Sequence, residues 1–69
     1  MWKVEVSEFN RRAGDSITYR EYFNSKNAAM EYIDSLADIN ADIYLEDMTP
    51  IGDGEYTDGE VVCIREAIM

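Results

Sequence analysis

The chain has 69 residues, one cysteine, no histidine and a formal net charge of −9 at pH 7. A chain this short forms one domain that buries only about 60% of its unfolded surface, so self-association would add useful stability. Its charge repels nucleic acid and anionic membranes, and its one cysteine excludes an intrachain disulfide.

The same composition argues against a site for chemistry. A zinc site needs several Cys or His ligands, and a serine or cysteine nucleophile needs a base that is ordinarily His. We therefore expect no metal, no cofactor and no enzymatic activity. The sequence shows neither a signal peptide nor an apolar run long enough to span a bilayer, which predicts a cytoplasmic protein without a membrane span.

Two alternating segments predict an antiparallel hairpin over residues 1–23. They are "MWKVEVSEF" and "ITYREYF", and alternation of this kind is typical of half-buried strands. Between them, "RRAGDS" predicts a turn in which Gly14-Asp15 supplies positive φ. The pattern leaves the register open. The residues that share one side of each strand are Trp2, Val4 and Val6 in the first strand and Ile17, Tyr19 and Phe23 in the second.

The stretch "NAAMEYIDSLADI" predicts a helix, because it is rich in alanine and contains neither proline nor glycine. Asn24 or Ser25 can cap its first turn, and the pattern stops near Asn40. At 100° per residue its apolar side chains form one stripe that would pack on a sheet. The stripe consists of Ala29, Tyr32, Ile33, Leu36, Ala37 and Ile39.

Two more strands are expected after the helix. "ADIYLEDM" alternates, "TPIGDGEYTDG" has the composition of a loop, and "EVVCIREAI" carries apolar residues on both faces from Val61 to Ile64. This last pattern predicts a central strand covered on both sides, with Cys63 as a small buried hydrophobe. The order ββαββ over residues 1–69 predicts an α+β domain with one amphipathic helix on a mostly antiparallel four-stranded sheet.

Charge is divided unevenly along the chain. Residues 1–26 hold five of the six bases and sum to +1, whereas residues 27–64 hold ten acids and no base. On the predicted helix Glu31, Asp34 and Asp38 fall within about 60° of one another. Like charges three and four residues apart cost a few tenths of a kcal/mol per pair. Such an acidic face is either simply solvated or serves a function. The accumulated repulsion between its like charges favours a function.

The stretch "DGEYTDGE", residues 53–60, resembles a calcium loop only in its acid content. If the loop began at Asp53, its sixth position would be Asp58 where a glycine is needed. Its twelfth position would be Ile64 where a bidentate acid is needed. Asp53-Gly54 and Asp58-Gly59 are instead turn dipeptides, so the stretch is predicted to be a connection that adds to the negative surface.

These observations predict a non-catalytic protein-binding module that blocks the basic, nucleic-acid-binding site of a partner protein. Carboxylates on successive helical turns lie about 5.4 Å apart, comparable with phosphates along a DNA strand. In size and charge the chain is similar in type to the short acidic proteins with which phages and mobile elements disarm host nucleases. The residues predicted to contact the partner are Glu31, Asp34, Asp38, Asp42, Glu46, Asp47, Asp53, Glu55, Asp58 and Glu60, with Tyr44 and Tyr56 as uncharged anchors.

The alternative is a small assembly protein that self-associates through an apolar sheet face or a free sheet edge. The aliphatic residues of the last strand favour it, and a homodimer is open under either hypothesis. The two differ in salt dependence: an electrostatic complex weakens as salt rises, whereas an apolar assembly tolerates it.

Overall fold

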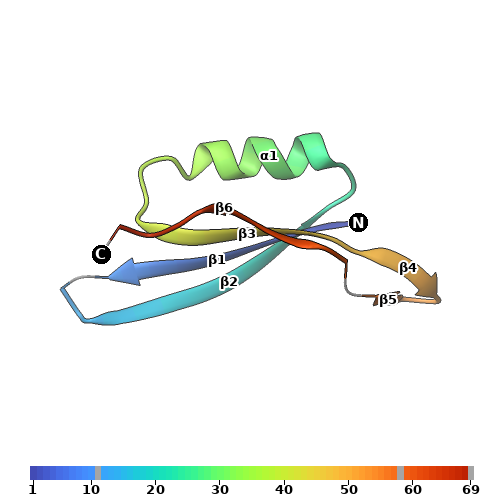
Figure 1. Ribbon diagram of the computed structural model, residues 1–69, viewed down its shortest axis with the longest axis horizontal. Coiled ribbons are helices and arrows are strands. Elements are labelled where there is room, and N and C mark those ends of the chain that lie inside the picture. The colour runs from blue at the N-terminus through green and yellow to red at the C-terminus, as the bar shows by residue number, and fades with distance from the viewer. Residues whose placement is uncertain (11, 58, 69) are drawn as a thin grey trace.

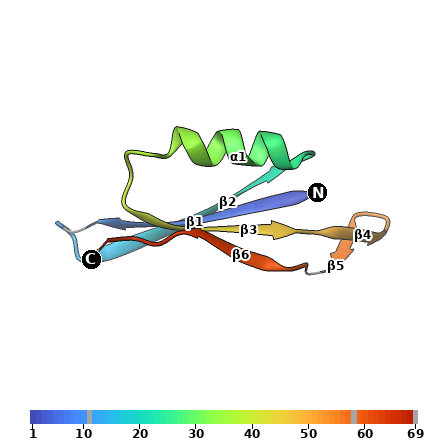
Figure 2. The same cartoon turned by 45° about the horizontal axis from the view of Figure 1, so that its top comes forward.

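A helix covers one face of an antiparallel sheet in the computed structural model, which describes residues 1–10, 12–57 and 59–68 (Figures 1 and 2). The sheet has the strand order β2-β1-β3-β6, and a separate hairpin, β4–β5, extends from one end of it. The predicted α+β fold is confirmed, with this hairpin added inside the expected loop. The elements of the described residues are β1 (Trp2–Asn10), β2 (Asp15–Phe23), α1 (Lys26–Ser35), β3 (Ala41–Asp47), β4 (Thr49–Gly52), β5 (Glu55–Thr57) and β6 (Val61–Arg65).

The hairpin β1–β2 forms as predicted. Its register runs from Trp2 opposite Phe23 to Asn10 opposite Asp15. Gly14 has φ +69°, the conformation that glycine adopts without steric cost. The side chain of Asn10 accepts hydrogen bonds from the backbone N–H groups of residues 12 and 13, which closes the turn. Predicted turn residue Arg11 lies outside the described residues.

The core lies between α1 and the middle of the sheet. Val4 is opposite Leu45 and Val6 is opposite Ile43, so alternation in β1 and β3 directs four aliphatic side chains to the helix side. Complete burial of each such side chain contributes about 1.5–3 kcal/mol. The buried apolar residues are Val4, Val6, Ala29, Ile33, Ala41, Ile43 and Leu45.

The helix begins where predicted but ends early. The Ser25 hydroxyl caps its N-terminus by accepting a hydrogen bond from the Ala28 N–H at 3.2 Å. The helix ends at Ser35, so the prediction that Asp38 shares a helical face with Glu31 and Asp34 is wrong.

The helix ends in tight turns, in which the N–H groups of Leu36 and Ala37 donate to the carbonyls three residues earlier, at 3.0 and 3.3 Å. A contact from far along the chain holds the segment that follows. The guanidinium group of Arg65 donates hydrogen bonds to the carbonyl oxygens of Leu36 and Ile39, at 2.5 and 3.2 Å. These carbonyls follow the helix C-terminus, where a basic side chain also suits the negative end of the helix dipole. Arg65 therefore stabilises the turn that leads into β3.

The prediction of a central, doubly covered last strand is also wrong. β6 pairs with β3 and forms one edge of the sheet. Val61 is 56% exposed and Val62 is 46% exposed, and the thiol-bearing Cys63 is exposed as well. α1 packs mainly over β1 and β2, so the outer strand beyond β3 has little cover. An apolar pattern on both faces does not reveal where in the sheet a strand lies.

Gly59 leads the chain into β6, but its role differs from that of a turn glycine. The structure gives Gly54, in the Asp53-Gly54 turn of β4–β5, a φ of +75°. At Gly59 a Cβ atom would instead overlap the backbone carbonyl of Asp47. The glycine therefore permits a close approach of two backbones. Asp58, the other half of this predicted turn dipeptide, lies outside the described residues.

Replacing Arg65 tests its role at the end of the helix. Arg65→Met keeps an unbranched apolar stem but removes the donors to the two carbonyls. We expect the free energy of unfolding to fall by about 1–3 kcal/mol in urea titrations followed by circular dichroism. The control is Arg20→Met, which breaks an exposed ion pair worth at most about 1 kcal/mol. Equal losses in both variants would contradict the capping role.

Candidate protein interface

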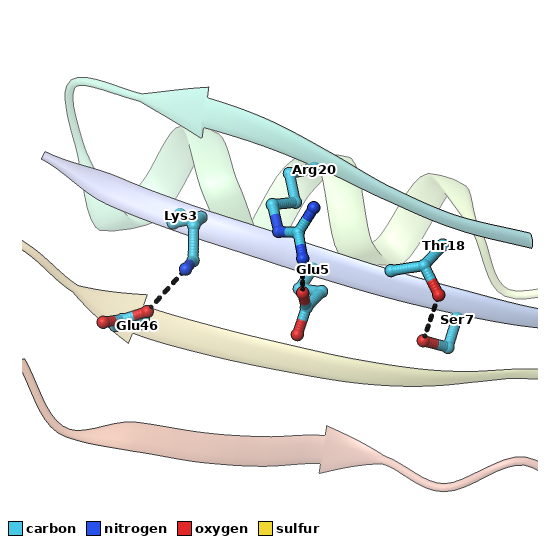
Figure 3. A network of polar contacts seen from close by, with 6 residues as sticks. All are labelled: Lys3, Glu5, Ser7, Thr18, Arg20 and Glu46. Carbon is cyan, nitrogen blue, oxygen red and sulfur yellow. Dashed lines mark hydrogen bonds and ion pairs between the residues drawn. The ribbon is translucent and has the colours of Figure 1, made fainter. Parts of the chain in front are cut away.

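The sheet face opposite α1 is a ladder of polar pairs between directly opposed residues (Figure 3). The pairs are Lys3 with Glu46 at 2.8 Å, Arg20 with Glu5 at 2.7 Å, and Ser7 with Thr18 at 3.0 Å. Cross-strand pairs of this kind each contribute roughly 0.2–1 kcal/mol. Two bases of the N-terminal segment, residues 1–26, are thus used inside the chain, by pairing with acids.

Glu46 is not part of an exposed acidic surface. Only 5% of it is exposed, and its carboxylate binds the Lys3 ammonium. The hydrogen bond from this ammonium to Glu46 raises the pKa of Lys3 above its ordinary value, although partial desolvation opposes the rise. The prediction that Glu46 contacts a partner placed it on the surface, and the β1–β3 register instead sets it against Lys3.

Six of the predicted contact acids are exposed in three places. Glu31 and Asp34 are exposed on α1, in the layer that lies above the sheet. Exposed residues Asp53 and Glu55 belong to the β4–β5 hairpin, which projects beyond the end of the sheet (Figure 1). Near the entry to β6, two more acids lie beside one hollow of the surface. These are Asp47 and Glu60.

The remaining predicted contact residues have other positions. Asp38 is exposed in the turn after the helix. Asp42 is half-buried, and its carboxylate accepts a hydrogen bond from the Ala67 N–H at 2.8 Å, which ties the segment after β6 to β3. Tyr44, on β3, and Tyr56, on β5, are half-buried. The tyrosines therefore keep part of their surface available to a partner.

Most of the predicted contact acids that the structure describes form no ion pair with another described residue. Of the described acids between residues 27 and 64, Glu46 alone forms an ion pair with another described residue. Arg65 follows this segment, and its guanidinium is directed to the carbonyls at the end of the helix. The potential of the exposed carboxylates therefore extends into solvent.

A hollow of about 510 Å³ lies between α1 and β6. Leu45, Val62 and Ile64 give it an apolar lining, and the Lys26 ammonium at its border lies 5.7 Å from the centre of the Trp2 ring. Sequence reasoning missed this feature. The hollow exists because the helix packs mainly over β1 and β2 and leaves β6 with little cover, which depends on the strand order and not on a local pattern.

No protein-family model, curated protein or solved structure matches this chain. In the part of the chain that the structure describes, no three His, Cys, Asp or Glu side chains are grouped so that they could hold a metal ion. The helix of that part is too short and too polar to cross a membrane.

The stability of the fold should fall in alkaline solution. Contact with Glu46 raises the pKa of Lys3 above 10.5, and burial raises the pKa of Tyr19 and of Tyr32 above 10.0. A group whose pKa is higher in the folded state holds its proton more tightly there. Its contribution is complete below the ordinary value and is lost as the pH rises through the folded-state pKa. We therefore expect the free energy of unfolding to decline above about pH 10.

Urea titrations between pH 7 and 11 measure this decline. Lys3→Met should be less stable at pH 7 and should show a shallower alkaline slope. The matched control is Lys26→Met, since Lys26 lies against a ring and not a carboxylate. A slope that is the same in the wild type and in Lys3→Met would refute the assignment to Lys3.

Proposed function

We propose that the protein is a non-catalytic, cytoplasmic protein-binding module whose exposed acidic surface covers the basic, nucleic-acid-binding site of a partner. The supporting observation is the unneutralised acidity of residues 27–64, where Glu46 is the one described acid in an ion pair with another described residue. Electrostatic attraction to a basic surface makes association fast and salt-dependent. A host defence nuclease complex is the class of partner that fits this chemistry.

The dimensions of the molecule support mimicry of a nucleic acid. Glu31 and Asp34 are exposed and three residues apart on the helix, a rise of about 4.5 Å at 1.5 Å per residue. The long axis of the molecule measures 43 Å, the length of roughly 13 base-pair steps along the DNA helix axis at 3.4 Å each. Hairpin residues Asp53 and Glu55 extend the charge toward one end of this axis (Figure 1). Glu46 is left out of this surface because it is buried.

Half-buried tyrosines supply the other component of such an interface. Tyr44 and Tyr56 are each partly exposed and partly covered by the fold. Aromatic side chains held in this way lose little conformational freedom on binding and are enriched among the residues that dominate interface energies. They would add affinity that does not depend on salt.

Self-association is the second candidate, and the exposed β6 edge favours it. Val61, Val62 and Ile64 present aliphatic surface beside strand backbone that has no second strand partner among the described residues. Sedimentation equilibrium at 0.05 M and 1 M salt separates the two candidates. A binding module of this charge stays monomeric or dimeric, whereas an apolar assembly forms an oligomer that persists at 1 M salt.

The partner can be captured from a bacterial lysate with tagged protein and eluted first with stepwise salt and then with duplex DNA. The double variant Glu31→Lys, Asp34→Lys should then bind the purified partner at least tenfold more weakly, about 1.4 kcal/mol, at 0.15 M salt. The dependence of log Kd on log salt should also become shallower.

The matched control for the double variant is Asp15→Lys, Glu21→Lys. It changes the net charge equally, but on exposed positions of β2. Its affinity should stay within threefold of the wild type. Equal weakening of both double variants would mean that net charge, and not the acidic surface of residues 27–64, governs binding.

A further inference from the structure

The two edges of the sheet differ in a way that singles out β6. β2 forms one edge and carries the charged residues Arg20 and Glu21, typical of an edge protected against pairing. β6 forms the other edge, and its first four residues, 61–64, are apolar and exposed. Its outer backbone groups have no strand partner within the described residues. Such an edge is a template for another strand.

The hollow beside β6 is placed to receive side chains of an added strand. Val62 is opposite Leu45 in the ladder, so both lie on the helix side of the sheet, where they line the hollow with Met30. In an extended strand alternate side chains point to the same face. A strand paired with β6 would therefore direct every second side chain toward this apolar lining, while the main chain supplies hydrogen bonds.

Charge indicates which kind of strand fits. Glu60 precedes β6, Glu66 follows it and Asp47 lines the hollow, whereas Lys26 is the base at the border of the hollow. The Arg65 charge is already engaged by helix carbonyls. An extended segment with Lys or Arg beside its aliphatic residues is complementary to these acidic surroundings.

A second copy of the chain fits the β6 edge less well than a basic segment does. Each copy brings a net charge of −9. In a two-fold antiparallel pairing of β6 centred on Cys63, Glu60 of one copy would face Glu66 of the other. Like charges directly opposite each other destabilise a strand pair.

We propose that β6 accepts an extended, basic segment of the partner as a fifth strand of the sheet, with aliphatic side chains of that segment in the hollow between α1 and β6. This inference rests on the proposed function, because it takes the partner to be basic. It adds a site of main-chain recognition to a surface that otherwise acts through charge.

Defined peptides test the proposal on the intact protein by NMR. The probe is an acetylated and amidated eight-residue peptide of alternating Val and Lys. We expect it to shift the amide signals of β6 and to slow their hydrogen exchange at least tenfold, while the amides of β2 stay unchanged. A Ser-Lys peptide of the same charge should bind at least tenfold more weakly, and a Val-Glu peptide should not bind.

Matched variants place the site. Val62→Lys puts a charge at the hollow and should weaken Val-Lys binding at least tenfold. Ile17→Lys makes the same kind of change at a 61% exposed aliphatic residue of the opposite edge. The affinity of this variant for the Val-Lys peptide should stay within twofold of the wild type.

Three results would overturn the proposal: no binding of the Val-Lys peptide, shifts confined to α1 and the β4–β5 hairpin, or protection of β6 that grows with protein concentration before peptide is added. The last result would assign the edge to a second copy. If the double variant Glu31→Lys, Asp34→Lys weakens binding of the full partner but Val62→Lys does not, this inference fails and the proposed function stands. If the Val-Lys peptide occupies β6 but no basic partner is found, the proposed function fails.

Discussion

A short helix has to cover a wide sheet, and most features of the surface follow from that mismatch. α1 has ten residues, about 15 Å of helix, above four strands. It packs mainly over β1 and β2. The side chains of β3 complete the core, whereas β6 is left with aliphatic residues in contact with water and with a hollow between itself and the helix.

The sheet face opposite α1 meets a different requirement, because its side chains on the central strands are polar and only partly exposed or buried. Directly opposed polar residues satisfy one another there, and Lys3 with Glu46 is the most buried of these pairs (Figure 3). The pairs use bases from the N-terminal segment. Most described acids of residues 27–64 consequently form no ion pair with another described residue. The uneven distribution of charge along the chain thus becomes an uneven distribution on the surface.

Local patterns predicted the parts of the fold that depend on neighbouring residues. Alternation in β1 and β2, the Gly14 turn and the Ser25 cap are all set within a few positions of sequence. The turn after the helix could not be predicted in this way, because the Leu36 carbonyl there accepts a hydrogen bond from Arg65, 29 positions further along the chain.

Sequence patterns were limited in the same way at the candidate site, where some environments depend on distant residues. The exposure of Glu31 and Asp34 followed from helical periodicity, whereas the burial of Glu46 depends on which residue of β1 lies opposite it. The exposure of β6 depends on strand order, which an apolar pattern does not encode. Residues whose environment comes from a distant strand are therefore those that sequence reasoning misplaced.

The strand order also has a consequence for the folding pathway. β1 and β2 are consecutive in the chain, so their hairpin closes a short loop. The pairing of β1 with β3 instead closes a longer loop that contains β2 and α1. Closing longer loops costs more chain entropy, and non-local pairs form more slowly. β6 pairs with β3 alone, so it docks on a partner strand that must itself be in place first. We therefore expect the exposed β6 edge to be the last part of the sheet to form and the first to detach when the domain opens locally.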